Sequence, residues 1–445
     1  MGLEDQTGSA GSAALPPGRP EERIGDWKPL YDEAGAIAES TRCLYCEDAP
    51  CIKACPTAIN IPEFIRKIGT GNRKGAARTI ITANILGYSC SRVCPVEELC
   101  AGSCVYNHLD QPPIAIGRLQ RYATEPIMNA GGFAGLLPEP KAPTGKRVAL
   151  VGAGPASLAA AALLRVEGHA AVIFEKDPFA GGLNTTGIAP YKMEAPASLA
   201  EAAWVLALGV ELRSGVAVGR DVSPESLLSD FDAVFLGLGI GGDKGLGLDS
   251  EQGAGVVGAT DLIRRIKTDP SLDLSGVRRA LIVGGGNTGL DIAHELALLG
   301  VGDVTMVYRK GEAEMSGYAH ELAAARKHGV RFLGWRAPLG VVRDAGGAAT
   351  GLRVRGPEGE EVLPTDLVVL AVGQDRGTAA LAASFTGVRT DSSGRVLVDP
   401  ATHRTGNPKV WAGGDCVNGG KEVVNAAAEA KIAVRDMHRA LTGGV

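Results

Sequence analysis

Eight of the nine cysteines lie in two groups of four within the first quarter of the chain. The stretch CLYCEDAPCIKACP carries one group, and CSRVCPVEELCAGSC carries the other. The residues are Cys43, Cys46, Cys51 and Cys55 in the first group and Cys90, Cys94, Cys100 and Cys104 in the second. Thiolates bind zinc and iron-sulfur clusters, and thiols also pair as disulfides. Two groups of four indicate two metal sites.

The spacing of the thiols favours iron-sulfur clusters. Zinc sites usually use two short C-x2-4-C pairs separated by a longer loop, whereas the first four thiols here form one dense run. Each group also contains a Cys-Pro pair, as in bacterial ferredoxins, in which this cysteine binds the neighbouring cluster. We predict two [4Fe-4S] clusters with crossed ligation, with zinc or a disulfide framework as the alternatives. One cluster takes Cys43, Cys46, Cys51 and Cys104, and the other takes Cys55, Cys94, Cys100 and a fourth ligand that this pattern leaves open.

The composition restricts the setting in which such clusters would work. The chain has 445 residues and a net charge of −5, which indicates about three domains and neither a nucleic-acid partner nor an anionic membrane surface. We find no apolar run near the roughly 18 residues of a membrane span and no secretory leader. We expect a cytoplasmic protein, where clustered thiols more often bind metals than form disulfides.

Helical patterns surround the cysteines. Apolar residues recur at three- and four-residue spacing in IPEFIRKI and GAARTIITAN, and Pro62 suits a first helical turn. We predict an all-α iron-sulfur domain over residues 23–143. Residues 1–22 are rich in Gly, Ala, Ser and Pro and are predicted to be a disordered tail.

A dinucleotide-binding pattern follows, in RVALVGAGPASLAAAALLRVEGHAAVIFEK. A buried strand leads into a tight turn at Gly152 and Gly154, and a helix comes next. The second strand ends at Glu175, whose carboxylate can accept hydrogen bonds from ribose hydroxyls while the helix N-terminus binds the pyrophosphate. Ser157 stands where a third glycine is usual and still allows close packing. The alternative is a strand and helix that bind no ligand.

The same pattern occurs again in VRRALIVGGGNTGLDIAHELALLGVGDVTMVYRK, with turn glycines Gly284, Gly286 and Gly289. Here Arg309 and Lys310, and no carboxylate, follow the second strand. A carboxylate suits the free ribose diol of FAD or NAD, whereas a guanidinium suits the 2′-phosphate of NADPH. We predict FAD in the first fold and NAD(P)H in the second. Solvated cations at a strand end are the alternative.

Three later segments extend the flavin domain. DAVFLGLG and DLVVLAVGQD read as buried strands ending in glycine turns, which suits crossings between two nucleotide domains. In VWAGGDCVNGGKEVV, Asp415 could bind flavin hydroxyls, and a helix beginning near Glu422 could direct its positive end at the flavin ring. An ordinary turn is the alternative at Asp415. Cys416 stands apart from the other thiols and is predicted to be a small buried residue.

The predicted fold is therefore α/β, with two Rossmann-like dinucleotide-binding domains preceded by the all-α iron-sulfur domain. The FAD-binding domain takes residues 144–250 and 376–445. The NAD(P)H-binding domain, residues 251–375, is inserted in it.

From about Arg23 the chain resembles the NAD(P)H-oxidising half of dihydropyrimidine dehydrogenases, within the wider family of glutamate synthase small subunits. The resemblance rests on both cysteine stretches and on IGRLQRYATE, GAGPAS, FEKDPFAGGL, GGGNTGLD, VYRKG and AGGD. GAGPAS and LQRYATE favour the pyrimidine branch.

The resemblance implies further site residues. In the pyrimidine enzymes a glutamine replaces one thiolate of the second cluster, and the matching residue here is Gln120. Cys90 then falls at a non-ligating position, although it could ligate as in the glutamate synthases. An arginine that helps to bind the 2′-phosphate in those enzymes is replaced here by Ser316, which weakens the expected NADPH preference. Additional cofactor contacts are implied at Pro155, Ala156, Ser157, Lys176, Gly182, Leu183, Asn287, Thr288, Gly373 and Gly414.

Together these parts predict a protein whose FAD accepts a hydride from NAD(P)H and whose two clusters then carry single electrons away from the flavin. We find no acid-base pair for a carbon substrate, nominate no catalytic residue and see no region for an FMN-binding barrel. We therefore expect an electron-input subunit in pyrimidine metabolism, with an FMN and iron-sulfur partner. A glutamate synthase small subunit, an NAD(P)H:ferredoxin-type oxidoreductase subunit, a flavin disulfide reductase and a zinc-bearing assembly module are the rival readings.

Overall fold

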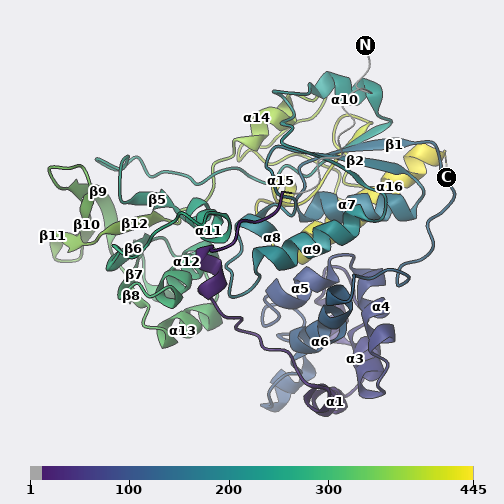
Figure 1. Ribbon diagram of the computed structural model, residues 1–445, viewed down its shortest axis with the longest axis horizontal. Helices are drawn as coiled ribbons and strands as arrows, with labels where there is room; N and C mark the ends of the chain where they lie inside the picture. Colours follow the sequence, from purple (N-terminus) through teal and green to yellow (C-terminus); the bar gives the residue numbers. More distant parts are fainter. Residues whose placement is uncertain (1–12, 444–445) are drawn as a thin grey trace.

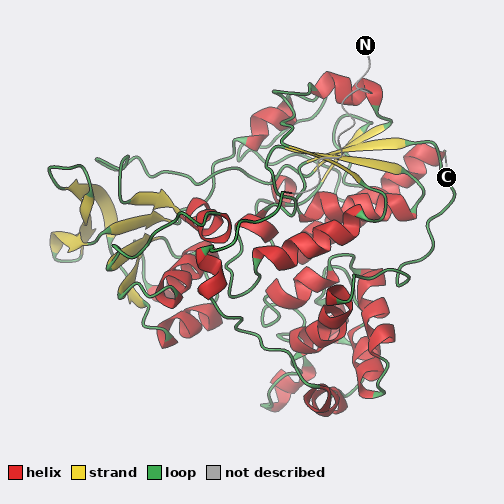
Figure 2. Ribbon diagram, in the orientation of Figure 1, coloured by secondary structure: helices red, strands yellow, loops and turns green. Residues whose placement is uncertain are grey.

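The computed structural model describes residues 13–443 and arranges them in three parts, which Figures 1 and 2 show. One part is helical, and each of the other two is built on a parallel five-stranded sheet. The predicted α/β class with a helical N-terminal domain is confirmed. None of the helices between residues 13 and 443 combines the length and apolar character needed to cross a bilayer.

The helical part packs short helices around an apolar core. Its elements are α1 (Glu33–Thr41), α2 (Pro50–Lys53), α3 (Ile61–Gly69), α4 (Arg73–Ala83), α5 (Gly87–Val93), the 3-10 helix η3 (Val105–Leu109) and α6 (Ile116–Asn129). In α3, Ile61, Phe64, Ile65 and Ile68 form one buried face at helical spacing, and the Asn60 side chain caps the N-terminus. The three- and four-residue periodicity of IPEFIRKI thus marks the side that packs into the core.

The first sheet has the order β13-β4-β1-β2-β3, and all its strands are parallel. The strands are β1 (Arg147–Val151), β2 (Ala170–Glu175), β3 (Glu211–Ser214), β4 (Ala233–Leu236) and β13 (Val410–Ala412). The helices are α7 (Pro155–Val166), α8 (Leu183–Thr186), α9 (Ala195–Leu206), α10 (Pro224–Asp230), α14 (Thr378–Ala383), α15 (Asp415–Asn418) and α16 (Val423–Thr442). Val148 and Leu150 of β1 belong to the core with α7 and α16, while Ala149 and Val151 belong to the core with α10 and α14.

The second sheet has the order β5-β12-β6-β7-β8 and is also parallel. Its strands are β5 (Val256–Gly258), β6 (Arg279–Val283), β7 (Asp303–Val307), β8 (Arg331–Leu333) and β12 (Leu367–Leu370). Its helices are α11 (Ala259–Thr268), α12 (Asn287–Leu298), the 3-10 helix η4 (Glu312–Glu314) and α13 (Ala319–Lys327). Because β13 joins the first sheet only after the second sheet is complete, one nucleotide fold interrupts the other.

A three-stranded antiparallel sheet covers the outer face of the second sheet, and we did not foresee it. It consists of β9 (Ala337–Arg343), β10 (Ala349–Gly356) and β11 (Gly359–Pro364), in the order β11-β10-β9. Leu352 and Val354 of β10 share a core with Leu281 and Val283 of β6. This small sheet closes one side of the nucleotide domain at the far left of Figure 1.

The N-terminal segment differs from the predicted tail. Residues 1–12 of the expected disordered stretch lie outside the described residues. Pro20–Arg23, however, form the 3-10 helix η2, and Glu21 is buried. The Glu21 carboxylate accepts a hydrogen bond from the Ala195 amide at 3.0 Å and pairs with Arg19 at 3.2 Å. The richness in Gly, Ala, Ser and Pro misled us because Arg19 and Glu21 are buried together as an ion pair.

The helical part is joined to the first nucleotide fold by a buried carboxylate. Glu201 of α9 accepts hydrogen bonds from the amide and the hydroxyl of Ser89 in α5. Burial raises the pKa of Glu201 to about 7, against the opposing hydrogen bonds from Ser89. The side chain therefore binds a proton more tightly in the folded than in the unfolded chain.

This shift predicts that Glu201 destabilises the protein as the pH rises. In the unfolded chain the carboxyl has its ordinary pKa of 4.5, whereas in the folded chain its pKa is about 7. The free energy of unfolding should fall across this window, by at most about 3 kcal/mol. We expect the melting temperature of Glu201→Gln to rise relative to wild type between pH 5 and pH 8. Glu225→Gln, on the exposed start of α10, is the control, and a difference independent of pH would contradict the assignment.

Candidate functional site

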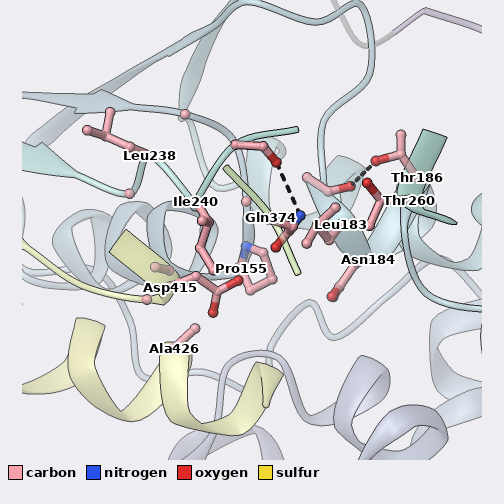
Figure 3. Close-up of a pocket in the computed structure, with 18 of the residues that line it drawn as sticks. Pro155, Leu183, Asn184, Thr186, Leu238, Ile240, Thr260, Gln374, Asp415 and Ala426 are labelled. Carbon is pink, nitrogen blue, oxygen red and sulfur yellow. Dashed lines mark hydrogen bonds between the residues drawn. The ribbon is translucent and has the colours of Figure 1, made fainter. Parts of the chain in front are cut away.

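A cavity of about 970 Å³ lies where the two nucleotide folds and the helical part meet. It is bounded by the turn between β1 and α7, the end of β4, the start of α16, parts of α11 and α12, and the segment after α5. Figure 3 shows Asp415, Pro155 and Ala426 on one side of it and Leu183 and Asn184 further along. The carboxyl ends of both parallel sheets therefore open onto one space, as ligand sites in such folds do.

The first glycine turn has the close backbone approach that a dinucleotide requires. Gly152 has a φ of 91°, and a Cβ there would lie 2.6 Å from the Gly237 carbonyl oxygen. Glu175 borders the cavity, and its two carboxylate oxygens accept hydrogen bonds from the amides of Ala153 at 2.6 Å and Asp177 at 2.8 Å. Burial raises the pKa of Glu175. Each carboxylate oxygen retains a lone pair, so the ribose diol of FAD fits this position.

Most of the other residues predicted for the flavin site border the same cavity. They are Gly154, Pro155, Ala156, Lys176, Gly182, Leu183, Gly414 and Asp415. Ser157 does not border it: the side chain is fully buried against Gly237, where a Cβ would lie 2.2 Å from the Ser157 hydroxyl. The serine thus takes the packing role of the third glycine and is not a contact residue.

The C-terminal turn brings carboxylates to the opposite wall. Asp415 accepts a hydrogen bond from the Lys421 amide at 3.3 Å, and burial raises its pKa. Glu422, the N-cap of α16, also borders the cavity and accepts a hydrogen bond from the Tyr318 hydroxyl at 2.9 Å. Tyr318 belongs to the other nucleotide fold, so this bond closes the cavity between the folds. We did not select Tyr318 or the side chain of Glu422 as site residues, because neither belongs to a recognisable motif.

The second glycine turn repeats the geometry of the first. Gly284 has a φ of 142°, and a Cβ there would lie 2.2 Å from the Ala371 carbonyl oxygen. Asn287 borders the cavity and accepts a hydrogen bond from the Tyr318 amide at 2.9 Å. Gly286 is the N-cap of α12, and the hydroxyl of Ser316 lies 3.5 Å from where its Cβ would be. A phosphate bound at this turn would therefore have the Ser316 hydroxyl near it.

The two cations after β7 lie outside the cavity and are exposed. Lys310 lies 3.5 Å from Glu314, whereas Arg309 forms no ion pair within residues 13–443. Thr288, in the first turn of α12, and Gly373, after β12, also lie outside the cavity. An exposed guanidinium without a partner is available to a phosphate, in accord with the predicted 2′-phosphate contact.

The four thiols predicted to bind the first cluster come from distant parts of the chain. Cys43, Cys46, Cys51 and Cys104 border one small, largely apolar cavity of about 30 Å³. Burial raises the pKa of Cys51 to about 11, and the neighbouring thiols of Cys43 and Cys104 add to it. Such thiols become thiolates when metal binding compensates for the burial. Cys55 does not border this cavity, which matches the crossed pattern.

The thiols predicted to bind the second cluster form a more deeply buried group. Burial raises the pKa of Cys100, and the neighbouring thiols of Cys94 and Cys55 add to it. Within residues 13–443, no three Cys, His, Asp or Glu side chains converge closely enough to hold one metal ion. The donor set suits an iron-sulfur cluster, because each thiolate of a [4Fe-4S] cluster binds a different iron atom.

Two candidates for the eighth ligand lie beside this group. The thiol of Cys90 lies beside that of Cys94, whose pKa it raises, and accepts a hydrogen bond from the Asn84 side-chain amide at 3.2 Å. Gln120 is buried in α6 and donates its side-chain amide to the Gly87 carbonyl at 2.8 Å. Its amide nitrogen is thus engaged with α5. The ninth cysteine, Cys416, is 3% exposed, as expected for the small buried residue that the sequence predicts.

Comparisons with known proteins agree with this division. Residues 21–131 match the family described as dihydropyrimidine dehydrogenase domain II, 4Fe-4S cluster, and residues 146–430 match that described as pyridine nucleotide-disulphide oxidoreductase. The chain is similar to the glutamate synthase [NADPH] small chain of Escherichia coli K12, at 32% identity over 90% of each chain. It is also similar to the NAD-dependent dihydropyrimidine dehydrogenase subunit PreT of the same strain, at 35% identity over 93% of this chain and 96% of PreT.

Among solved structures, the fold is similar to thioredoxin reductase from T. acidophilum. The TM-score is 0.54 at 23% identity, covering 65% of this chain and 97% of that one. FprA from Mycobacterium tuberculosis gives a TM-score of 0.52 at 21% identity, covering 67% of this chain and 86% of FprA.

The alternative ligands make opposite predictions. If Gln120 is the ligand, Cys90→Ser should retain both clusters and Gln120→Ala should alter one, because one iron loses its protein ligand. Electron paramagnetic resonance of the reduced variants measures this. Cluster loss in Cys90→Ser with an unchanged spectrum in Gln120→Ala would assign the position to Cys90.

Arg309 should select NADPH over NADH. A charge-assisted hydrogen bond contributes about 1.5 to 3 kcal/mol, so Arg309→Ala should weaken NADPH about 10- to 100-fold and leave NADH nearly unchanged. The measurement is kcat/KM for both nucleotides at fixed ionic strength. Equal losses for both would mean that Arg309 supports the loop and does not bind the 2′-phosphate.

Proposed function

Since the chain belongs to the pyridine nucleotide-disulphide oxidoreductase family and carries an N-terminal 4Fe-4S domain of the dihydropyrimidine dehydrogenase type, we propose that it is an electron-input subunit. It takes electrons from NAD(P)H and passes them through FAD and two [4Fe-4S] clusters to a separate catalytic subunit. The chain is thus an NAD(P)H-dependent flavin oxidoreductase whose final substrate binds to its partner.

One observation carries this proposal: the central cavity reaches the segment of the chain that carries Cys94. Val93 and Pro95 border the cavity on either side of Cys94 in the chain. A flavin held by the first glycine turn would therefore lie against the segment that carries a cluster ligand. Cys51 and Cys55 are four residues apart and are predicted to bind different clusters, so the second cluster site is in turn close to the first.

The residues of this chain bind and orient, and none is needed for acid-base catalysis. FAD, when bound, accepts two electrons at once and returns them singly, and iron-sulfur clusters carry single electrons. Glu175 and the Gly152 turn would hold its adenosine and pyrophosphate, and Asp415 would hold hydroxyls nearer the ring. Asn287 reaches the cavity from the other fold, at the side where NAD(P)H would enter. Stacking of the two rings requires orientation and exclusion of water.

Disulfide chemistry, which the family name mentions, has no support in this chain. Cys416 is the single cysteine after Cys104. Burial raises its pKa to about 12, and its thiol donates to the carbonyls of Leu236 and Gly413 at 3.4 Å. A reductase of that type needs a pair of accessible thiols beside the flavin. The electrons must leave by another route, and the thiol groups of the helical part provide one.

The partner is proposed from the names of relatives. PreT is named as a subunit of a dihydropyrimidine dehydrogenase, and the other relative is named as the small chain of a glutamate synthase. We favour a pyrimidine-reducing partner of the FMN and iron-sulfur type, because Gln120 occupies the position of the glutamine ligand of that branch. A glutamate synthase partner is the second candidate and is favoured if Cys90 is the ligand.

The chain alone should act as a diaphorase. We expect it to oxidise NAD(P)H with ferricyanide and to reduce neither uracil nor thymine, because residues 13–443 contain no further catalytic domain. It should also form no glutamate from 2-oxoglutarate and glutamine. Steady-state assays under argon with the purified chain measure this. Reduction of pyrimidines by the single chain at a rate comparable to ferricyanide reduction would refute the proposal that a separate subunit binds the final substrate.

A further inference from the structure

One tryptophan stands out because it is exposed and has an unusual backbone conformation. Trp335 is 57% exposed, whereas Trp204 and Trp411 are 6% and 1% exposed. Its φ of 56° lies in the left-handed region, which bulky residues rarely adopt. Packing in a hydrophobic core therefore does not explain why this large apolar side chain has a strained backbone conformation.

Three backbone hydrogen bonds fix Trp335 beside the segment that follows β7. The amide of Trp335 donates to the Lys310 carbonyl at 3.0 Å, and the amide of Arg336 donates to the Tyr308 carbonyl at 2.9 Å. The Tyr308 amide in turn donates to the Leu333 carbonyl at 3.0 Å. The left-handed residue thus aligns the segment after β8 with residues 308–310.

The indole ring lies directly against this segment. A Cβ at Gly311 would lie 2.9 Å from Trp335 Cζ2, 3.2 Å from Cε2 and 3.4 Å from Nε1. The ring is therefore in contact with the backbone one residue beyond Lys310. More than half of its surface remains free for a ligand. A flat aromatic surface and two exposed cations, Arg309 and Lys310, lie next to one another at the end of the sheet.

The topology indicates which part of a dinucleotide reaches this place. The glycine turn after β6 binds the pyrophosphate, and the residue after β7 meets the 2′ position of the adenosine ribose. β8 is the next strand of the same parallel sheet, and Trp335 follows it. The adenine ring, attached to that ribose, therefore lies at the end of the sheet where Trp335 stands.

We propose that Trp335 is a stacking platform for the adenine ring of NADPH and NADH. The inference rests on the proposed function, in which the second nucleotide fold binds NAD(P)H. It divides recognition of the adenosine between two residues. Arg309 binds the 2′-phosphate, which only NADPH carries, whereas Trp335 binds the adenine base that both nucleotides share. The left-handed conformation holds the ring in the binding position before the nucleotide arrives, which reduces the ordering required on binding.

The test compares two substitutions in the cofactor-loaded protein, with NADP⁺, NAD⁺ and adenosine 2′,5′-bisphosphate as probes in isothermal titration calorimetry. Trp335→Asn removes the ring but tolerates the left-handed backbone. Trp335→Phe keeps an aromatic surface. Stacking of a base on an aromatic side chain predicts about 5- to 150-fold weaker binding of all three probes to Trp335→Asn, with most of the loss restored in Trp335→Phe. Val362→Ala, an exposed apolar residue of β11, should bind like wild type.

A kinetic control separates binding of adenine from support of the fold. Reduced nicotinamide mononucleotide has no adenosine, so its rate of flavin reduction should be the same in wild type and Trp335→Asn. Wild-type affinity in Trp335→Asn would overturn the stacking role. So would a loss of affinity confined to NADP⁺ and adenosine 2′,5′-bisphosphate, the two probes that carry a 2′-phosphate. Wild-type protein that binds neither NADP⁺ nor NAD⁺ would refute the proposed function together with this inference.

Discussion

The buried ion pairs of Lys192 fix the orientation of one nucleotide fold relative to the other, and the shape of the cavity between them depends on this orientation. Lys192 follows α8 in the flavin fold and pairs with Asp291 of α12 at 2.7 Å and with Glu321 of α13 at 2.5 Å. These carboxylates raise the pKa of Lys192 against the effect of burial. Removing the lysine would leave two buried carboxylates facing each other, which is far more costly than losing an exposed pair.

The neighbouring residues of this loop strengthen the same joint. The Tyr191 hydroxyl donates to Asp291 at 2.6 Å, and the buried Lys267 of α11 donates to the carbonyls of Ile188 and Met193 at 2.7 and 2.6 Å. Residues 188–193 thus bind both α11 and α12 of the other fold. Because the first glycine turn and Asn287, which begins α12 after the second turn, border the same cavity, the orientation fixed here decides whether a nicotinamide can reach a flavin. The Tyr318–Glu422 hydrogen bond closes the far side of the same space.

Much of this arrangement could be predicted because it follows from local patterns. Gly152 and Gly284 were recognisable because each turn joins a buried strand to a helix, and the structure gives each a positive φ with no room for a side chain. The meeting of Cys104 with Cys43 was predicted from the Cys-Pro pairs. The roles of the individual site residues, including those of Arg309 and Gln120, remain predictions.

The features that we missed depend on contacts between distant segments. Glu21 looked like part of a polar tail, yet it is buried because Arg19 and the Ala195 amide satisfy its carboxylate. Ser157 looked like a cofactor contact, whereas its neighbour Gly237, which no motif identifies, makes it a packing residue. Trp335 carries no sequence signal, since its importance comes from a backbone conformation and from a hydrogen bond to Lys310.

The central claim is that thiols from separated segments hold two clusters next to a flavin that NAD(P)H reduces. The most direct test is to purify the chain without air and count its iron, acid-labile sulfide, zinc and flavin, then add NADPH. We predict about eight iron atoms and eight sulfides with one FAD per chain, and electron paramagnetic resonance signals of reduced clusters after the addition. One zinc ion or more per chain with negligible sulfide, or clusters that stay oxidised while the flavin is reduced, would contradict it.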